Sequence, residues 1–384
     1  MKIVIATDSF KGNLTSLQAA NAIEQGVRRV LPKAACRKIP VADGGEGTVR
    51  ALLDAVGGKS IHKRVMGPAG QAVRAHYAIL SDQKTAVIEM AEAAGLHLVD
   101  DATRNPLNTT SFGVGQLIIA AIQNGAKKII VGVGGSATLD AGMGMAQALG
   151  VRFFDDVGNL IEQPGCGGLL STVAGIDIST IHPAIRKIKV TIASDVENPL
   201  FGEEGAAYVY GAQKGATLAM QKTLDFNLKQ FSKLVNTELG RDAGDISGAG
   251  AAGGLGFGLN VFAKAKMKSG IELVAQLTGL KRHISGADLV ITGEGRIDAQ
   301  TAFGKTPIGV AKIARKLKVP VVAIGGTLSD DSNELFQIGI DGLEGAVVRE
   351  MSLAEALKNS EAYLANAAER VIRLLLIGQK MRNR

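Results

Sequence analysis

The sequence predicts an α/β protein with two domains, one built from both ends of the chain and one inserted between them. Near each end, short apolar runs alternate with helical patterns and lead into glycine-rich loops, as in open parallel sheets. In between, apolar residues alternate singly around Gly67–Gly70, which indicates an antiparallel hairpin and a mixed sheet. The predicted domains are residues 1–60 plus 285–384, and residues 61–284. A length of 384 residues favours two domains.

The N-terminal segment reads as strand, helix, strand and helix. An apolar run at Ile3–Ala6 predicts the first strand. Thr15 and Gln18 have the spacing of a capping box, and apolar residues recur at helical spacing from there to Leu31. A second strand is predicted near Arg37–Val41. This order is typical of a parallel sheet, in which the ligand-binding loops lie at the carboxyl ends of the strands.

The middle of the chain adds further strands and helices to the hairpin. Apolar runs predict strands at Ala86–Met90, Lys128–Val133 and Ile188–Ala193. Apolar periodicity predicts helices at Phe112–Asn124 and near Met220–Leu239. The pattern is that of a mixed-sheet α/β domain.

The parallel pattern returns near the C-terminus. The apolar run Leu289–Ile291 predicts a strand that stops at Gly293–Gly295, where glycines allow a tight turn close to a ligand. Thr306 is a good N-cap, and the helix Pro307–Leu317 begins with a proline, which suits a first helical position. A last core strand is predicted at Val319–Ile324.

Composition narrows the class of protein. The two cysteines, Cys36 and Cys166, suggest no disulfide framework, and neither a signal-peptide core nor a membrane-length apolar run is present. We therefore expect a cytoplasmic protein without membrane contact. Aromatic residues make up only 4% and basic residues are scattered, which disfavours nucleic-acid binding. The net charge of +7 would attract anionic substrates, although it serves solubility equally well. The oligomeric state stays open, with a homodimer as one possibility.

Five strand-to-loop junctions share one signature, an apolar strand followed by acidic residues among Gly or Ser. They are Asp8 with Lys11, Asp43 with Glu46, Ser136 with Asp140, Asp195, and Glu294 with Asp298. Any single junction is more often a helix cap than a site, but five together favour a shared acidic cleft. A phosphotransferase needs carboxylates that bind Mg²⁺, a carboxylate that acts as base, and cations that bind phosphate. Lys305, beside a predicted helix start, suits a phosphate.

Other functional classes are less well supported. The segment Gly248–Gly253 spells a dinucleotide fingerprint, but no apolar strand precedes it. Lys305 does not belong to a Walker A motif, because Ala299 stands where that motif needs glycine. The five histidines lack metal-site spacing, and no nucleophile elbow is present.

As a set, the motifs resemble those of the bacterial-type glycerate kinase family, which pairs a flavodoxin-like domain with an inserted restriction-enzyme-like domain. The matching stretches are residues 8–12 (DSFKG), 40–48 (PVADGGEGT), 86–91 (AVIEMA), 134–138 (GGSAT), 140–145 (DAGMGM), 195–200 (DVENPL), 213–215 (QKG), 250–254 (GAAGG), 270–272 (GIE) and 287–305. Thr7, Ala141 and Ala212 depart from the family pattern, whereas the acidic and lysine positions are intact.

The resemblance implies an ATP- and Mg²⁺-dependent kinase that phosphorylates D-glycerate, giving 2-phosphoglycerate, in a cleft between the two domains. It also implies a place in glyoxylate, glucarate or galactarate breakdown. Two alternatives from other classes remain open: an NAD-dependent hydroxy-acid oxidoreductase and a non-catalytic sugar-acid sensor.

Each junction or motif then receives a candidate role. The catalytic candidates are Asp195, Asp140 and Lys11, with Asp195 preferred as the base because it ends an apolar strand. The substrate-binding candidates are Asp8, Ser9, Asp43 and Arg296. The nucleotide- or phosphate-binding candidates are Gly134, Gly135, Ser136, Lys214, Gly253, Gly254 and Lys305. The metal-ligand candidates are Glu294 and Asp298, which neighbour Lys305.

Overall fold

The structure, a computed structural model, describes residues 1–302 and 305–382 and divides into two compact units. The terminal unit comprises Met1–Asp43, Arg50–Gly57 and Ser269–Arg384; the insert unit comprises Gly44–Val49 and Gly58–Lys268. The sequence predicted that the chain passes from one domain to the other at residues 60/61 and 284/285. The structure instead groups α9 (Gly270–Thr278) and α10 (Leu280–Ile284) with the terminal unit.

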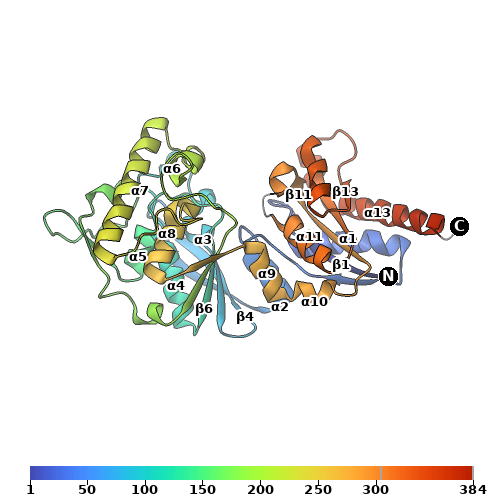
Figure 1. Cartoon of the computed structure of the whole chain (residues 1–384), viewed down its shortest axis with the longest axis horizontal. Helices are drawn as coiled ribbons and strands as arrows, with labels where there is room; N and C mark the ends of the chain where they lie inside the picture. The colour runs from blue at the N-terminus through green and yellow to red at the C-terminus, as the bar shows by residue number, and fades with distance from the viewer. Residues whose placement is uncertain (303–304, 383–384) are drawn as a thin grey trace. The chain divides into compact units, whose positions relative to one another are not determined.

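The terminal unit is built on a five-stranded parallel sheet, as the sequence predicted (Figure 1). Its strands are β1 (Lys2–Thr7), β2 (Ala35–Lys38), β11 (Leu289–Ile297), β12 (Val321–Leu328) and β13 (Gly342–Gly345). The order across the sheet is β2-β1-β11-β12-β13, and every pairing is parallel. This is the flavodoxin-like order, in which the strand sequence reverses between the first and third strands. Here that switch point lies between β1 and β11.

Helices cover both faces of this sheet. These are α1 (Ser16–Val30) and α13 (Ser360–Arg382) on one face and α11 (Thr306–Lys316) on the other. The unit also contains α9, α10, α12 (Leu353–Lys358) and the Arg50–Val56 part of α2 (Thr48–Val56). The predicted capping box of α1 is confirmed, since Gln18 donates its backbone N–H to the Thr15 hydroxyl at 3.2 Å and its side chain accepts from the Thr15 N–H.

Strand alternation decides which helix each residue meets. Ile3 of β1 and Ile291 of β11 point into a core shared with α1 and α13, the blue and red helices of Figure 1. Val4 and Val290 point to the opposite face, which α11 covers, and are also fully buried. Both faces are therefore apolar, which explains why these strands read as continuous hydrophobic runs.

The prediction that the third core strand stops at Gly293–Gly295 is wrong. β11 continues to Ile297, and Arg296 pairs with Thr327 of β12. Gly293 serves close packing instead, because a Cβ at this position would lie 2.1 Å from the Ile324 carbonyl oxygen. Glu294 consequently lies within the strand rather than past its end.

The insert unit has a six-stranded mixed sheet in the order β10-β9-β6-β5-β4-β3. Its strands are β3 (Gly58–Met66), β4 (Ala72–Leu80), β5 (Thr85–Glu89), β6 (Lys128–Gly132), β9 (Lys189–Ala193) and β10 (Lys266–Lys268). The predicted β3–β4 hairpin is confirmed as antiparallel, and β5, β6, β9 and β10 pair in parallel. A small antiparallel pair, β7 (Arg152–Phe154) and β8 (Gly175–Asp177), lies outside this sheet.

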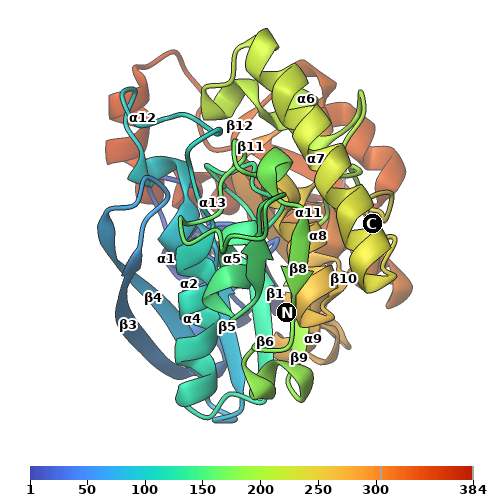
Figure 2. The ribbon, with the colours of Figure 1, turned by 90° about the vertical axis from the view of Figure 1, so that its left-hand side faces the viewer.

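Helices α3, α4 and α8 of the insert unit pack on this sheet, with α4 in front of the β3–β5 strands in Figure 2, and α5, α6 and α7 pack against other helices. Their residue ranges are α3 (Ala91–Ala94), α4 (Phe112–Gln123), α5 (Met143–Ala148), α6 (Ala206–Tyr210), α7 (Leu218–Leu239) and α8 (Ala251–Ala263). Phe153, Phe231 and Phe257 meet in the core with ring centroids 5.8–6.3 Å apart. Within the described residues of the chain, no helix is long and apolar enough to span a membrane.

The α1–α13 contact makes a testable prediction about stability. A Cβ at Gly26 would lie 1.9 Å from the Ala365 carbonyl oxygen, so Gly26→Ala forces the two helices apart. We expect a loss of about 1–3 kcal/mol in the free energy of unfolding. Gly378→Ala in α13 is the matched control, because nothing lies within 4 Å of its new methyl group. The control should be neutral or stabilising by about 0.5–1 kcal/mol. Urea unfolding of both variants measures the difference, and equal stabilities would contradict the packing argument.

Candidate functional site

A cavity of about 460 Å³ lies in the terminal unit where β1, β11, β12 and β13 end. Open α/β sheets bind their ligands at this edge, beside the switch point. One end of the cavity, here called the polar end, carries most of its charged side chains. They are Asp8 and Lys11 after β1, Glu294 and Arg296 in β11, and Asp298 and Lys305 after it. The sequence had proposed all six residues for the site, and the structure brings them together.

Asp8 is the buried acid of the polar end, with only 3% of its surface exposed. Its Oδ1 accepts the Ser9 N–H at 2.6 Å, and its Oδ2 accepts the Thr306 hydroxyl. Burial and the nearby Asp43 carboxylate raise the Asp8 pKa to about 7, against the opposing effect of these hydrogen bonds and Lys11. Asp8 can therefore hold or release a proton near neutral pH.

The same contact corrects the predicted start of α11. Lys305 occupies the N-cap position, and Thr306 and Pro307 are the first helical residues. The Thr306 side chain does not cap the helix, because its hydroxyl is committed to Asp8. This shift of one residue puts the Lys305 side chain at the rim of the cavity, where it is half-buried.

Glu294 and Asp298 form the second acidic pair of the polar end. Thr301 donates its hydroxyl to Glu294 Oε1 at 2.7 Å, and burial raises the Glu294 pKa. Asp298 lies between two cations, 3.5 Å from Lys305 Nζ and 3.4 Å from Arg296 Nε. Asp298 Oδ1 is buried and accepts no hydrogen bond from the part of the chain that the structure describes.

The carboxylates of Glu294 and Asp298 decide whether the predicted Mg²⁺ fits the polar end. Over residues 1–302 and 305–382 no group of three or more His, Cys, Asp or Glu side chains could enclose a metal ion. Mg²⁺ seldom needs such a cage, since one or two carboxylates usually hold it together with substrate phosphates and water. Glu294 and Asp298 fit that pattern.

A second set of predicted residues meets in the insert unit, around the loop after β6. Lys214 is 1% exposed, and its Nζ donates to Ser136 Oγ and to the Thr138 carbonyl oxygen, both at 2.7 Å. Burial lowers the Lys214 pKa to about 7, and the Asp140 carboxylate only partly opposes this. The lysine thus holds the loop in shape, and its predicted nucleotide contact stays a prediction.

Asp140 closes the same loop and is fully buried. Its Oδ2 accepts the Ser111 N–H at 2.8 Å and the Ser111 hydroxyl at 2.7 Å, and its Oδ1 accepts the Gly142 N–H at 3.1 Å. Burial raises its pKa. These contacts tie the start of α4 to the segment before α5, and the catalytic role assigned to Asp140 stays a prediction.

The glycines of the insert unit have two different surroundings. Gly253 and Gly254 are buried with φ of 67° and 87°, and a Cβ on Gly253 would lie 1.8 Å from the Thr138 carbonyl oxygen. Close packing therefore explains both residues without a ligand, and their predicted nucleotide contact is untested. Gly134 and Gly135 are exposed beyond the end of β6, where a ligand can reach their backbone.

Glu89, at the end of β5, is a buried acid for which the sequence motifs predicted no role. It is 8% exposed and accepts the Val49 N–H at 2.7 Å and the Gly47 N–H at 3.3 Å. It thereby caps the first turn of α2 and anchors the glycine-rich segment before it. Burial raises its pKa to about 7. The sequence held a signal for this role, because a glutamate within an apolar strand needs a specific hydrogen-bonding partner when it is buried.

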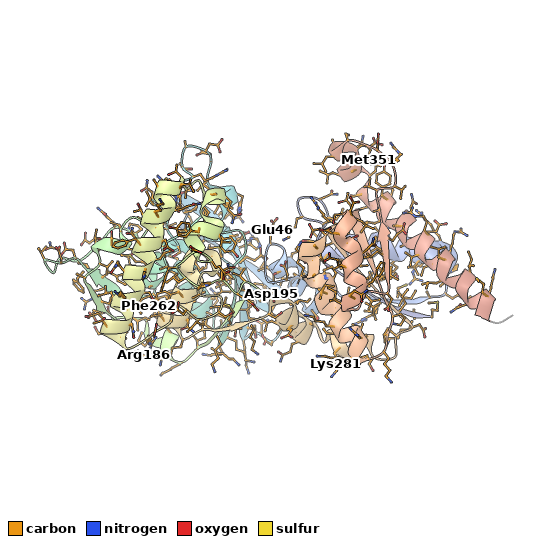
Figure 3. The ribbon with its side chains drawn as sticks, turned by 45° about the horizontal axis from the view of Figure 1, so that its top comes forward. Glu46, Arg186, Asp195, Phe262, Lys281 and Met351 are labelled. Carbon is orange, nitrogen blue, oxygen red and sulfur yellow. The ribbon has the colours of Figure 1, made fainter. Side chains whose placement is uncertain are left out.

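Asp195 follows β9 and is half-buried, and Figure 3 labels it with Arg186, which lies before the same strand. The strand therefore delivers Asp195 to the same sheet edge as Glu89 and Gly134, because β5, β6 and β9 are parallel neighbours. This is the edge at which a parallel sheet presents ligand-binding loops.

Similarity to known proteins identifies the family. A model of the glycerate kinase family matches residues 3–376. The chain belongs to the glycerate kinase family. It is therefore a phosphotransferase that uses an alcohol group as acceptor, as the sequence motifs predicted.

Individual relatives span nearly the whole chain. A glycerate kinase from Halalkalibacterium halodurans is 52% identical, covering 96% of this chain and 97% of its own. A glycerate 2-kinase from Escherichia coli K12 is 46% identical over 99% of both chains. The crystal structure of a candidate glycerate kinase 2 from Salmonella typhimurium LT2 shares 45% identity, covers 99% of both chains and has a TM-score of 0.88. The fold and the predicted family are thereby confirmed.

The raised pKa of Glu89 predicts how stability depends on pH. Because its folded pKa of about 7 exceeds its ordinary 4.5, the folded state binds more protons between these values. The corresponding stability is complete below pH 4.5 and is lost as the pH rises through 7. From pH 4.5 to 8, the wild-type protein should lose on the order of 3 kcal/mol relative to Glu89→Gln.

Urea unfolding at several pH values tests this dependence. The control is Glu46→Gln, which changes an exposed glutamate in the same segment and should follow the wild-type profile. Parallel profiles for the wild type and Glu89→Gln would show that Glu89 does not titrate in this range.

Proposed function

We propose that the protein transfers the γ-phosphoryl group of ATP to the 2-hydroxyl of D-glycerate, releasing ADP and 2-phospho-D-glycerate. The observation that carries the proposal is the polar end of the cavity, where carboxylates and three cationic side chains meet at the β1/β11 switch point. The choice of substrate and product is supported by the glycerate 2-kinase from Escherichia coli K12, 46% identical over nearly the full chain.

Phosphoryl transfer depends on positioning and on charge more than on covalent help from the protein. In this proposal Lys305 and Lys11 balance the negative charge of the transferred phosphoryl group, and Arg296 binds the carboxylate of glycerate. The Asp8 carboxylate accepts hydrogen bonds from the hydroxyl groups of glycerate, and the Ser9 hydroxyl can donate or accept them. Asp43 lies beside these two residues and is the third substrate-binding candidate. Arg296 suits this role because its side chain is 70% exposed and its Nε lies 3.4 Å from Asp298, so the guanidinium can still reach a ligand carboxylate.

We infer that Mg²⁺ enters with the nucleotide and is held by Glu294 and Asp298 together with phosphate oxygens. When bound there, it would neutralise charge on the β- and γ-phosphates. Asp298 Oδ1 is buried and accepts no hydrogen bond from the described part of the chain, so this oxygen can serve as a metal ligand.

During the reaction a bond forms between the glycerate oxygen and phosphorus, and the bond from phosphorus to the leaving ADP oxygen breaks. The glycerate hydroxyl loses its proton, and we propose the Asp195 carboxylate as the acceptor. This role is supported by the position of Asp195, which lies half-buried just past β9, at the edge of the insert sheet where parallel strands present ligand-binding loops. The predicted location of the reaction between the two domains stays a prediction.

The activity itself can be tested directly. Purified protein with D-glycerate, ATP and Mg²⁺ should release ADP, and phosphorus NMR should show a phosphate ester on the secondary carbon 2. An ester on the primary carbon 3 would refute the assigned product. Reduction of NAD⁺ by glycerate without ADP release would favour the oxidoreductase alternative, and binding of glycerate without any turnover would favour the sensor.

Lys305 offers a test of the phosphate-binding role. Loss of a charge-assisted contact typically costs about 1.5–3 kcal/mol, so Lys305→Ala should raise the KM for ATP by about 10- to 150-fold. Lys312→Ala is the matched control, because Lys312 is exposed on the same helix and does not line the cavity. Steady-state kinetics at saturating glycerate provide the measurement. Equal KM values for the two variants would remove Lys305 from the phosphate site.

Asp195→Asn tests the proposed base, because it keeps the shape of the side chain and removes its basicity. The single-turnover rate should fall about 10²- to 10⁴-fold, while glycerate affinity measured by calorimetry changes little. Glu197→Gln is the control, since Glu197 is exposed two residues further along the same loop. Near-normal turnover of Asp195→Asn would exclude it as the base, and loss of nucleotide-Mg²⁺ binding would reassign it to the metal.

A further inference from the structure

The cavity of the terminal unit has a second end that differs in chemistry from the polar end. Beyond β12 and β13 it is lined by Val347, Leu353, Ala356, Leu357, Tyr363 and Leu364, here called the apolar end. Three strand spacings separate β1 from β13, a distance of about 14 Å. A three-carbon acid bound at the polar end would leave the apolar end empty.

Helix α12 supplies half of this apolar end and covers no core of its own. None of its residues is buried, and Leu353 is 74% exposed. Leu353, Ala356 and Leu357 recur at the i, i+3 and i+4 spacing that places them on one side of a helix. All three line the cavity. Figure 3 labels Met351, which lies two residues before this helix begins.

Polar contacts hold α12 in place without using that apolar side. The Ser352 hydroxyl accepts the Glu355 N–H at 3.2 Å and so caps the helix. Arg349 forms an ion pair with the Glu355 side chain, which ties the preceding loop to the helix. The Val347 N–H donates to the Gly326 carbonyl oxygen at 3.2 Å and fixes the same loop on β12. The helix is therefore positioned before any ligand arrives.

We propose that the apolar end binds the adenine ring of the phosphoryl donor, with its phosphates extending to Lys305 and Lys11 at the polar end. This inference rests on the proposed use of ATP. A nucleotide has the same division as the cavity, with a flat, weakly polar ring at one end and a polyanion at the other. Small-molecule sites are mostly apolar with a few placed polar groups, and 460 Å³ falls within their usual volumes. Leu353, Ala356 and Leu357 are then the side chains that select a nucleotide over free polyphosphate.

Ala356→Gln tests the inference, because the longer side chain fills the apolar end. Ala354→Gln is the matched control, since Ala354 is exposed on the same helix and does not line the cavity. Calorimetry with Mg²⁺-ATP and with Mg²⁺-tripolyphosphate separates the ring from the phosphates. We expect Ala356→Gln to weaken ATP binding at least about tenfold while tripolyphosphate binding stays within about twofold, and Ala354→Gln to match wild type for both.

Photolabelling of the wild-type protein with 8-azido-ATP gives a second readout that does not depend on how a variant folds. Labelled peptides should come from residues 347–364 and disappear when ATP is added in excess. Labelling elsewhere, or an Ala356→Gln variant that binds ATP as wild type does, would overturn the adenine assignment while leaving ATP use intact. A wild-type protein that neither binds ATP nor releases ADP with glycerate would instead refute the proposed function.

Discussion

The pairing of β1 with β11 is the constraint on which the terminal unit depends. It joins residues 286 positions apart, with Ile3 opposite Leu289 and Thr7 opposite Gly293. Closing so long a loop costs conformational entropy, which the burial of both faces of the sheet must offset. The same register sets Asp8, just past β1, beside the end of β11 that carries Glu294. The chemistry of the polar end is thus a consequence of strand pairing between the two ends of the chain.

Burial shifts the pKa values of several candidate site residues, because opposite charges nearby do not fully offset the loss of solvent. Asp8 and Glu89 lie almost out of solvent, and their carboxyl pKa values rise to about 7, whereas Lys214 is buried and its pKa falls to about 7. In each case desolvation of the charged form is the largest cause. Each of these groups also makes at least two hydrogen bonds to neighbouring residues, which fix its position. Such shifted groups gather at functional sites more often than elsewhere.

Glycine has a structural task at several of the motifs that mark the family. Gly253 packs against the Thr138 carbonyl oxygen, and Gly293 packs against that of Ile324, at distances where no side chain fits. The glycine-rich signature of the sequence therefore reports close backbone packing as well as possible ligand loops. Only Gly134 and Gly135, exposed past β6, leave their backbone open to a ligand among the glycines predicted to bind nucleotide.

The sequence by itself determined the α/β class, the capping box of α1, the β3–β4 hairpin and the membership of the polar end, because these follow from local periodicity and from the rule that parallel strands gather their loops at one edge. Tertiary structure alone decided that β11 runs on through Glu294, that the Thr306 hydroxyl serves Asp8 rather than its own helix, and that Glu89 caps α2. It also decided that α12 turns an apolar side toward the cavity. Each of these depends on a partner distant in sequence, and the free energy of a buried hydrogen bond or a close backbone contact is settled only when both partners are in place.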